Sequence, residues 1–525
     1  MRESSSTATL EPPRRLWGML RFAGPGMIVA GSIVGSGELI ATTKTGAEAG
    51  FVLLWLIILG CVVKVFAQVE LGRYTLISGK TTLDALTDVP GPRIAGRGNW
   101  LVWYWFLMWI CSISQLGGIV GGVGEALAIS LPVTQMGRDY NAAADAGITA
   151  RLRSRVPQAA ADEATAPGEA AVPAALAALE AERAMQRYTE KYSVTVDGER
   201  RVRFPADVAI WATIVAAGTS ILLAVGRYGL IQSFSTVLVG SFTVLVIVNL
   251  YFLQEQPEWR VRASEFWSGL AFRLPQSSEG LNPIRTALAT FGIIGVGAAE
   301  LVTYPYWCLE RGYARFTGPN DGSEAWTQRA RGWMRVMRVD AWGSAIVYTF
   351  STVAFFLLGA AVLHRSELNP GKDDMVRTLA AMFVPVFSDY AAAVFLFGAV
   401  AVLYSTFFVA NASHARVFTD ALRVMGLIED SPESRQRWVV RLSGFFPVLC
   451  LVIYLGYREP AQLVLISGVA QGIMLPMLAA AALYFRYRRT VEALRPGSWW
   501  DALLWISAGA MLVTGAWTIY DRLTA

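Results

Sequence analysis

Long apolar runs recur along the whole of this chain of 525 residues. Each is long enough to cross the hydrocarbon core of a bilayer, and each is continuous and does not alternate with polar residues, which predicts helices and not barrel strands. We expect membrane-spanning helices at residues 27–47, 51–77, 103–131, 208–225, 231–252, 284–309, 345–363, 391–409, 442–455, 463–484 and 503–519. The pattern therefore predicts an all-α membrane protein with about eleven transmembrane helices.

The composition agrees with this class. The chain is 54% hydrophobic and only 16% charged, which excludes a soluble globular protein. Its four cysteines lie far apart inside apolar runs, with neither zinc spacing nor a disulfide framework. The net charge of +5 is better explained by arginines in cytoplasmic loops than by nucleic acid. We expect no cofactor, no enzymatic activity and no nucleic-acid partner, and a lipid bilayer as the surroundings.

Arginines in the short loops predict the orientation. Six lie in residues 311–338, five in residues 416–441, and more follow the tenth span, all on one side of the predicted membrane. That side also carries the polar tail of residues 1–22, so we expect a cytoplasmic N-terminus and, after an odd number of spans, a C-terminus outside. The expected location is the plasma, or inner, membrane.

One large insert, residues 136–204, separates the first three helices (residues 23–135) from helices four to eleven (residues 205–525). It contains ten basic and ten acidic residues, and the topology places it outside the cytoplasm. Helical spacing covers residues 176–188, and an Asp-Gly pair predicts a β-hairpin near residues 194–204. The insert could be a lid or a partner-binding element, although its composition also fits a partly disordered loop.

Two spans combine helix-weakening glycines with an acid. The first carries Gly35, Ser36, Gly37 and Glu38 in succession. The sixth carries Gly292, Gly295 and Gly297, and then Ala298, Ala299 and Glu300, with Thr303 beyond. A separation of five helices fits two inverted repeats whose broken helices expose backbone groups for a substrate near mid-membrane. Close helix packing is the alternative explanation for the glycines.

Charged side chains inside the spans are the main candidates for chemistry. Glu38 and Glu300 would be costly in hydrocarbon unless a cation, a proton or a fixed partner compensates them. Lys64 lies in the middle of the second span and is the obvious partner, which leaves a purely structural role for the acids open. His414 on the eighth span could carry protons, or could simply be a hydrogen-bonded residue of the bundle.

Short motifs in these spans resemble the Nramp family of proton-coupled divalent metal transporters. The matching motifs are Gly24-Pro25-Gly26, Gly46-Ala47, Leu54-Trp55, Gly79-Lys80, Tyr404-Ser405-Thr406 and Ser467-Gly468-Val469, in the family's order. The resemblance implies a LeuT-type inverted-repeat fold with broken helices 1 and 6, and alternating access of a substrate held between those helices.

The functional residues of the family are replaced here. Gly35 and Glu38 stand where the family has its metal-binding Asp and Asn, and Leu301-Val302-Thr303 stands where it has Met-Pro-His. Loss of the thioether favours harder ions such as magnesium or manganese. Gln471 lies near the position of a glutamine that the family associates with the metal site. The acids that the family associates with proton passage fall near Gly118 and Gly121, which argues against the family's proton route.

We therefore expect a divalent cation held by Glu38 and Glu300, with oxygens from Ser36 and Thr303 and backbone carbonyls from Gly35 and Ala298. The alternative substrate is a small organic solute such as an amino acid, because Gly35-Ser36-Gly37 also resembles the helix break of the amino acid, polyamine and organocation transporters. A third possibility is a receptor or sensor that binds without transport.

Overall fold

The computed structural model describes residues 9–94, 97–161, 168–196, 199–226, 228–276, 282–371 and 374–524. Within them, nine helices are long and apolar enough to cross a membrane. Two further spans complete the eleven: the first is divided into shorter helical segments, and α11 is only partly described. The prediction of an eleven-helix membrane bundle is confirmed.

The spans in chain order are α2 (Pro25–Ile33) with η1 (Val34–Thr42) and α3 (Thr43–Ala49), α4 (Leu54–Ser78), α6 (Trp100–Ser112) with α7 (Ser114–Ser130), α10 (Asp207–Val225), α11 (Tyr228–Leu253), α13 (Pro283–Ile293) with α14 (Ala298–Arg311), α16 (Glu324–Leu358) with η2 (Gly359–His364), α19 (Ala391–Val424), α20 (Pro432–Gly456), α21 (Pro460–Tyr484) with η6 (Phe485–Arg489), and α22 (Ser498–Leu523). We number these spans helices 1 to 11.

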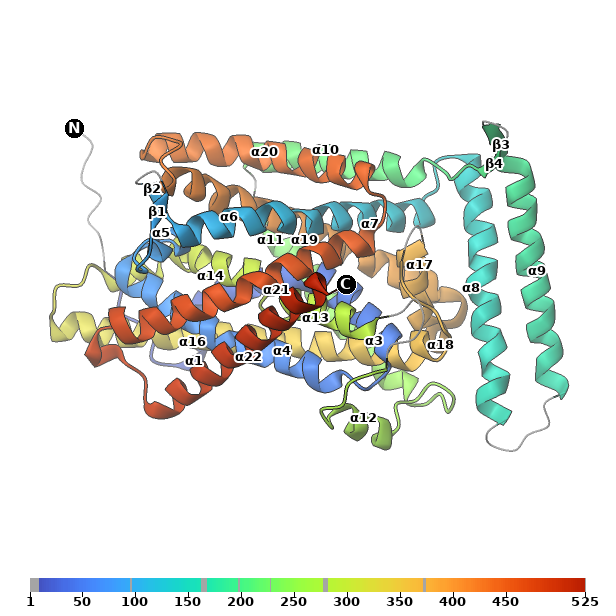
Figure 1. Cartoon of the computed structure of the whole chain (residues 1–525), viewed down its shortest axis with the longest axis horizontal. Coiled ribbons are helices and arrows are strands. Elements are labelled where there is room, and N and C mark those ends of the chain that lie inside the picture. The colour runs from blue at the N-terminus through green and yellow to red at the C-terminus, as the bar shows by residue number, and fades with distance from the viewer. Residues whose placement is uncertain are drawn as a thin grey trace.

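Short elements join the spans. They are α1 (Leu16–Phe22), α5 (Thr82–Leu86), β1 (Arg93–Ile94), β2 (Arg97–Asn99), α12 (Ala263–Gly269), α15 (Tyr313–Thr317), α17 (Met375–Ala380), η4 (Ala381–Phe383), α18 (Val384–Phe387), η5 (Ser388–Tyr390) and η7 (Glu492–Leu494). Most spans run side by side along the long axis of the molecule, and α21 packs against α7, α13 and α22 (Figure 1).

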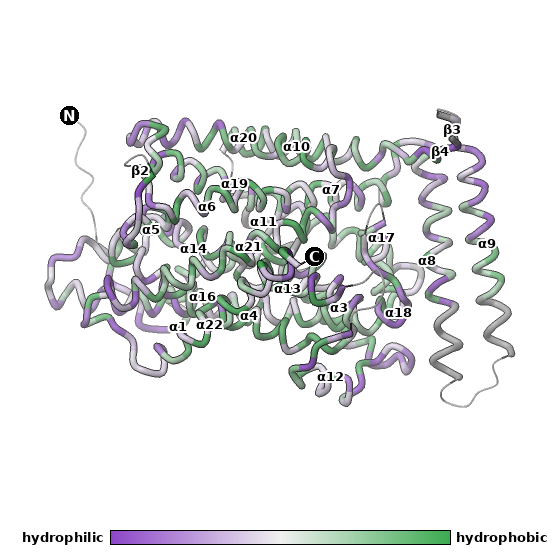
Figure 2. Tube along the Cα trace, viewed as in Figure 1, coloured by the Kyte–Doolittle hydropathy of each residue, from purple (hydrophilic) through white to green (hydrophobic). Residues whose placement is uncertain are grey.

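The two ends of the bundle differ. One end carries α5 and the β1–β2 hairpin, and we call it the α5 end (Figure 1). The arginine-rich segments at residues 311–338, 416–441 and 485–497 lie there. The opposite end, the insert end, carries α12, α17 and α18 beside the insert. Figure 2 shows apolar residues concentrated along the bundle and polar residues toward both ends, as a membrane-spanning bundle requires.

The insert forms a helical hairpin of α8 (Gln135–Ala161) and α9 (Gly168–Tyr192), which pack against each other. The helices stand roughly perpendicular to the spans (Figure 1). The strands β3 (Ser193–Val196) and β4 (Glu199–Val202) follow as an antiparallel hairpin, as predicted, although its Asp-Gly turn at 197–198 lies outside the described residues. Helix covers more of the insert than residues 176–188, the part with predicted helical spacing. The helix α9 extends beyond these residues at both ends, and α8 is an additional helix.

Candidate functional site

Helix 1 is interrupted by a π-helical segment, η1, and not by an extended break. The Thr406 hydroxyl of α19 donates to the Gly31 carbonyl at 3.1 Å and accepts from the Gly35 N–H at 3.2 Å. It therefore replaces a backbone hydrogen bond that an α-helix would make between these two residues. Such insertion widens the helix locally. A Cβ on Gly35 would lie 2.3 Å from this hydroxyl oxygen, so the position requires glycine.

Helix 6 is fully broken between α13 and α14. Residues 294–297 leave the helix, and Gly295 takes a left-handed conformation with φ +56°, which favours glycine. A Cβ on Gly37 of η1 would lie 2.9 Å from the Ile293 carbonyl oxygen, so the two interrupted helices meet backbone to backbone at this point. The break places the carbonyl end of α13 and the N–H end of α14 next to η1.

Lys64 of α4 reaches the carbonyl end of α13. Its ammonium donates to the carbonyls of Phe291 and Ile294, both at 2.6 Å, and lies 4.9 Å from the centre of the Phe291 ring. The side chain is completely buried, so it cannot extend to either face of the membrane. The negative end of a half-helix dipole and two carbonyl oxygens therefore surround this cation.

Glu38 lies in η1 and is also completely buried. One carboxylate oxygen, Oε1, accepts a hydrogen bond from the Thr352 hydroxyl of α16 at 2.9 Å. The other, Oε2, has no hydrogen-bond partner in the part of the chain that the structure describes. An unsatisfied buried carboxylate oxygen is costly, so this atom is available to a ligand.

Glu300 lies in the first turn of α14, where a carboxylate is favoured by the helix dipole. A Cβ on Gly297 would lie 2.5 Å from Glu300 Oε2 and 3.0 Å from the Gln471 Oε1 of α21, so both side chains converge on this glycine. Gln471 accepts from the Ala299 N–H at 3.0 Å. Glu300 is close enough to Glu38 and Lys64 for direct electrostatic interaction with both.

A hydrogen-bonded group behind Gln471 fixes its orientation. Its amide nitrogen donates to Gln115 Oε1 of α7 at 2.7 Å and to the Ser467 hydroxyl at 3.1 Å. Ser467 also donates to the same Gln115 oxygen at 3.0 Å. The amide oxygen of Gln471 is thereby directed toward α14, which couples helix 3 and helix 10 to the break in helix 6.

Thr303 and His414 line a separate small cavity of about 10 Å³, together with Trp109 and Ala299. The indole N–H of Trp109 donates to His414 Nδ1 at 2.8 Å, which fixes the neutral tautomer with its proton on Nε2. Thr303 donates to the Glu300 backbone carbonyl at 3.3 Å. The cavity lies between α6, α14, α19 and α21, next to the Glu300 end of the site.

The structure thus brings four of the predicted residues together: Glu38, Lys64, Glu300 and Gln471. Gly35 and Gly37 serve close packing, and the Ser36 side chain lies outside the described residues. The carbonyl of Ala298 lies within the first turn of α14, so the carbonyl groups freed by the break are those at the end of α13. Among the described residues, no three His, Cys, Asp or Glu side chains form a metal-binding group.

The sequence predicted no role in the site for Thr352, Thr406 or Gln115, although Thr406 belongs to the Tyr404-Ser405-Thr406 motif. Hydroxyl and amide side chains are ordinary in membrane helices, where they commonly bond to their own backbone, so the local sequence does not identify their partners. Only the fold brings them to the site.

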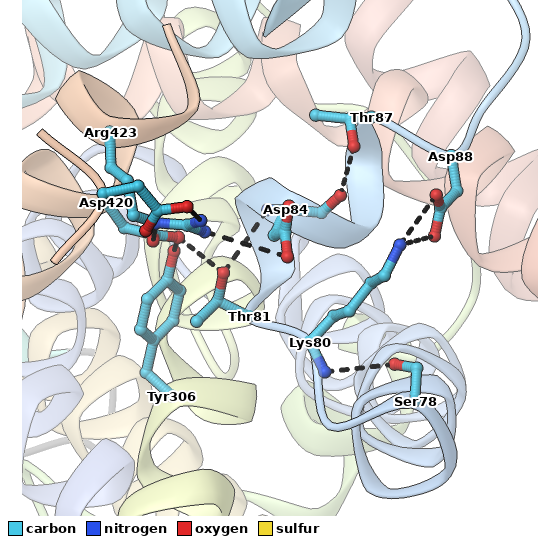
Figure 3. A network of polar contacts seen from close by, with 10 residues as sticks. Ser78, Lys80, Thr81, Asp84, Thr87, Asp88, Tyr306, Asp420 and Arg423 are labelled. Carbon is cyan, nitrogen blue, oxygen red and sulfur yellow. Dashed lines mark hydrogen bonds and ion pairs between the residues drawn. The ribbon is translucent and has the colours of Figure 1, made fainter. Parts of the chain in front are cut away.

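At the α5 end, a polar cluster ties α5 to α14 and α19 (Figure 3). Asp420 accepts from the Thr81 hydroxyl at 2.5 Å, the Tyr306 hydroxyl at 2.6 Å and the Arg423 guanidinium at 2.9 Å. Arg423 also lies 3.7 Å from Asp84. We call Thr81, Asp84, Tyr306, Asp420 and Arg423 the α5-end cluster. It connects the α14 half of helix 6 to helix 8 and to the loop after helix 2.

A second tie at the α5 end holds the start of helix 1. Asp340 of α16 accepts from the Gly24 and Gly26 N–H groups at 2.8 and 2.7 Å. A Cβ on Gly26 would lie 2.6 Å from the Ser344 hydroxyl oxygen, which explains the glycine. The Gly24-Pro25-Gly26 motif thus joins the start of helix 1 to helix 7.

At the insert end, Lys44 of α3 donates to Asn369 at 2.6 Å and to the Pro370 carbonyl at 2.8 Å, and pairs with Glu48 at 3.1 Å. Glu48 accepts from the Thr286 hydroxyl of α13 at 2.6 Å. We call Lys44, Glu48, Thr286, Asn369 and Pro370 the insert-end cluster. The buried site therefore lies between two polar clusters, one toward each end of the bundle.

Comparison with known proteins identifies the family. The family model described as natural resistance-associated macrophage protein-like, Nramp, matches residues 201–521, which is more than half of the chain. This chain belongs to the Nramp family. Its members are membrane transporters, so the predicted class of protein is confirmed. No curated protein sequence matches the chain.

Solved Nramp structures share the fold. A histidine-to-alanine mutant of the Eremococcus coleocola manganese transporter is 15% identical, with a TM-score of 0.58 over 98% of this chain and 90% of that one. The same transporter in complex with an aromatic bis-isothiourea substituted compound gives a TM-score of 0.56, with the same identity and coverage. The Nramp match by sequence begins at residue 201, yet the structural match also covers the first three helices and so includes Glu38 and Lys64.

Proposed function

We propose that this Nramp protein is a secondary transporter that moves a divalent metal cation across the membrane by alternating access. The observation that carries the proposal is the pair of buried carboxylates on the two interrupted helices, with Glu38 Oε2 unpartnered among the described residues. Buried acids of this kind mark ion pathways in membrane proteins. The structural neighbour is named a manganese transporter, which agrees with this substrate class.

The proposed ligands are hard. Glu38 and Glu300 supply carboxylate oxygens, and the backbone at the helix breaks supplies further oxygens. With no thioether or imidazole ligand from these residues, we expect magnesium or manganese to be preferred over softer transition metals.

The proposed orientation puts the α5 end in the cytoplasm and the insert outside. The arginine-rich loops of the α5 end support it. The N-terminus would then be cytoplasmic and the C-terminus outside.

A small zwitterionic solute is the second candidate substrate. Lys64 lies within electrostatic reach of both glutamates, so the site offers charges of both signs. The ammonium could meet a substrate carboxylate, and a glutamate could meet its amine.

The test is binding and uptake by the purified protein. Equilibrium binding of manganese, magnesium, zinc and a panel of amino acids would be measured, followed by uptake into proteoliposomes with and without a proton gradient. We expect saturable divalent binding that Glu38→Gln and Glu300→Gln each weaken about tenfold or more, because each removes a negative ligand. Glu182→Gln on the exposed face of α9 is the control and should change nothing.

Each other outcome has a defined meaning. Divalent binding that survives both substitutions refutes the site. Amino acid binding without divalent binding supports the zwitterion instead. Saturable binding without uptake, both with and without the proton gradient, identifies a sensor and refutes the transporter.

A further inference from the structure

The position of Lys64 suggests a role beyond pairing with an acid. Its ammonium donates to two backbone carbonyls at the end of α13, each at 2.6 Å, and lies over the face of the Phe291 ring. Broken membrane helices offer these groups, carbonyl oxygens at the negative end of a half-helix, to free monovalent cations. Here a side chain from helix 2 fills the position.

We propose that Lys64 is the resident cation of the helix 6 break, and that it determines specificity by occupying a site that would otherwise take a free sodium or potassium ion. The inference rests on the proposed function for the location of the substrate site, but it concerns a different cation. It implies that binding in this protein needs no monovalent cation.

The burial of the site supports this role. The Lys64 side chain is completely buried, and the Cβ of any residue at Gly60, one turn before it, would lie 2.8 Å from Ile294. Helix 2 therefore packs closely against the break, and the ammonium is enclosed beside the α13 carbonyls. A cation tethered in this way stays with the protein, whereas a free ion can dissociate.

The charge of the site leads to the same conclusion. When both glutamates are ionised, one ammonium leaves the site with a single negative charge, so Lys64 lowers the attraction of the site for any cationic substrate. Removing the ammonium would strengthen divalent binding and would also leave two unpaired carbonyls in a negative environment. A sodium ion bound at these carbonyls would restore the positive charge and would also give the two carbonyl oxygens a partner.

A purely structural role for Lys64 makes a different prediction. If the side chain only holds the broken helix in place, its removal would destabilise the protein in every salt alike. If it substitutes for an ion, the loss would be reversed by that ion and by no bulky cation.

The test compares Lys64→Met with the unchanged protein in sodium, potassium or N-methyl-D-glucamine chloride at equal ionic strength. We expect the melting temperature of K64M to rise with sodium or potassium concentration, while the unchanged protein melts at one temperature in all three salts. Arg183→Met, which removes an exposed positive charge from α9, should melt at one temperature in all three salts, like the unchanged protein. A K64M protein with the same melting temperature in all three salts would overturn the proposal.

A second variant keeps the test decisive if K64M does not fold. The double variant K64M/E300Q removes one charge of each sign, and we expect it to fold with a weaker dependence on sodium than K64M. Equal stability of the double variant in all three salts, with its α13 carbonyls unpaired, would count against a monovalent cation site.

Divalent binding separates this inference from the proposed function. In N-methyl-D-glucamine, K64M should bind manganese about tenfold more tightly than the unchanged protein, and sodium should compete with it. Sodium stabilisation without any divalent binding would support the Lys64 proposal while refuting metal transport. Divalent transport with no effect of sodium on K64M would support metal transport and refute the Lys64 proposal.

Discussion

At the scale of single residues, Thr406 decides the shape of helix 1. Its hydroxyl donates to the Gly31 carbonyl and accepts from the Gly35 N–H, so it bridges the interruption in the helix. We predict that Thr406→Val lowers the free energy of unfolding by about 1 to 3 kcal/mol, because both buried backbone groups would lose this hydrogen-bond partner. Thermal unfolding in detergent measures the change.

Two matched variants isolate the hydroxyl. Thr406→Ser keeps the donor and acceptor and should stay close to the original stability. Thr213→Val removes an exposed threonine hydroxyl that bonds to the Ala209 carbonyl of its own helix, so it should have little effect. If T406V proves as stable as T406S, the hydroxyl does not hold helix 1 in this form.

The charged residues of the site could be predicted from sequence, and their partners could not. Glu38, Lys64 and Glu300 are conspicuous because a charge in an apolar run is expensive and needs a reason. Thr352 and Thr406 are 314 and 371 residues away from Glu38 and Gly35, the residues that they bond at the site. Thr406 lies in a family motif, but that motif does not say which group its hydroxyl contacts. A local pattern carries no information about such a contact.

At the scale of elements, the glycines of helices 1 and 6 have different effects. Those of helix 6 allow a full break, because Gly295 takes a left-handed conformation. Those of helix 1 allow close contact with α19 and α13, and the helix stays closed as a π-helical segment. Glycine spacing predicted the location of both interruptions but not their form, which depends on the helices packed against them.

The carboxylate of Asp139 joins α8 to the end of α9 through hydrogen bonds. Asp139 accepts hydrogen bonds from Lys191 at 2.6 Å, Tyr192 at 2.7 Å and Gln135 at 2.8 Å. The hydrogen bond from Lys191, followed by those from Tyr192 and Gln135, lowers the pKa of Asp139 from 3.8 to about 2. The ionised form is therefore the one that joins the two helices.

This pKa predicts how the hairpin responds to acid. Since the pKa is lower in the folded state than in the unfolded state, the stabilisation is fully present above about pH 4 and is lost as the pH falls toward about 2. We expect the amide protons of α8 and α9 to lose protection from hydrogen exchange over that range, after correction for the intrinsic pH dependence of exchange.

Asp139→Asn provides the comparison. Its hairpin should be less protected than the original at pH 5, and the difference should shrink as the pH falls through about 2, where Asp139 becomes protonated and neutral. A difference that is constant from pH 5 to pH 2 would mean that the charge of Asp139 does not fasten the hairpin.

At the scale of the whole molecule, the bilayer explains why so much of the fold could be predicted. Lipid requires continuous apolar helices, so hydropathy predicted an all-α bundle of about eleven spans and the loops between them. The insert has no such constraint, because its alanines and mixed charges suit a surface helix and an unstructured loop alike. Packing of α8 against α9 and contacts with the bundle favour the helical form. Arg377 of α17 illustrates this, since it bonds to Asn141 of α8 at 2.6 Å.

The two polar clusters predict how the whole bundle would move. If the protein works by alternating access, the α5-end cluster must open in one state and the insert-end cluster in the other. Tyr306→Phe removes one hydrogen bond to Asp420, and Thr286→Val removes one to Glu48. Each should favour opening at its own end by about 1 kcal/mol, which corresponds to about a fivefold change in population.

Cys308 can report this opening, because it is buried in α14, the half of helix 6 that the α5-end cluster holds. With Cys308 as the single cysteine, we expect a membrane-impermeant thiol reagent applied at the α5 end to label Y306F several-fold faster than the parent and T286V more slowly. The double variant should label more slowly than Y306F. Weakening both clusters favours opening at the two ends equally, so the ratio of the two open states returns to that of the parent while the state closed at both ends becomes less populated. Additive effects on thermal stability with no change in labelling would show that the clusters stabilise the fold without controlling access.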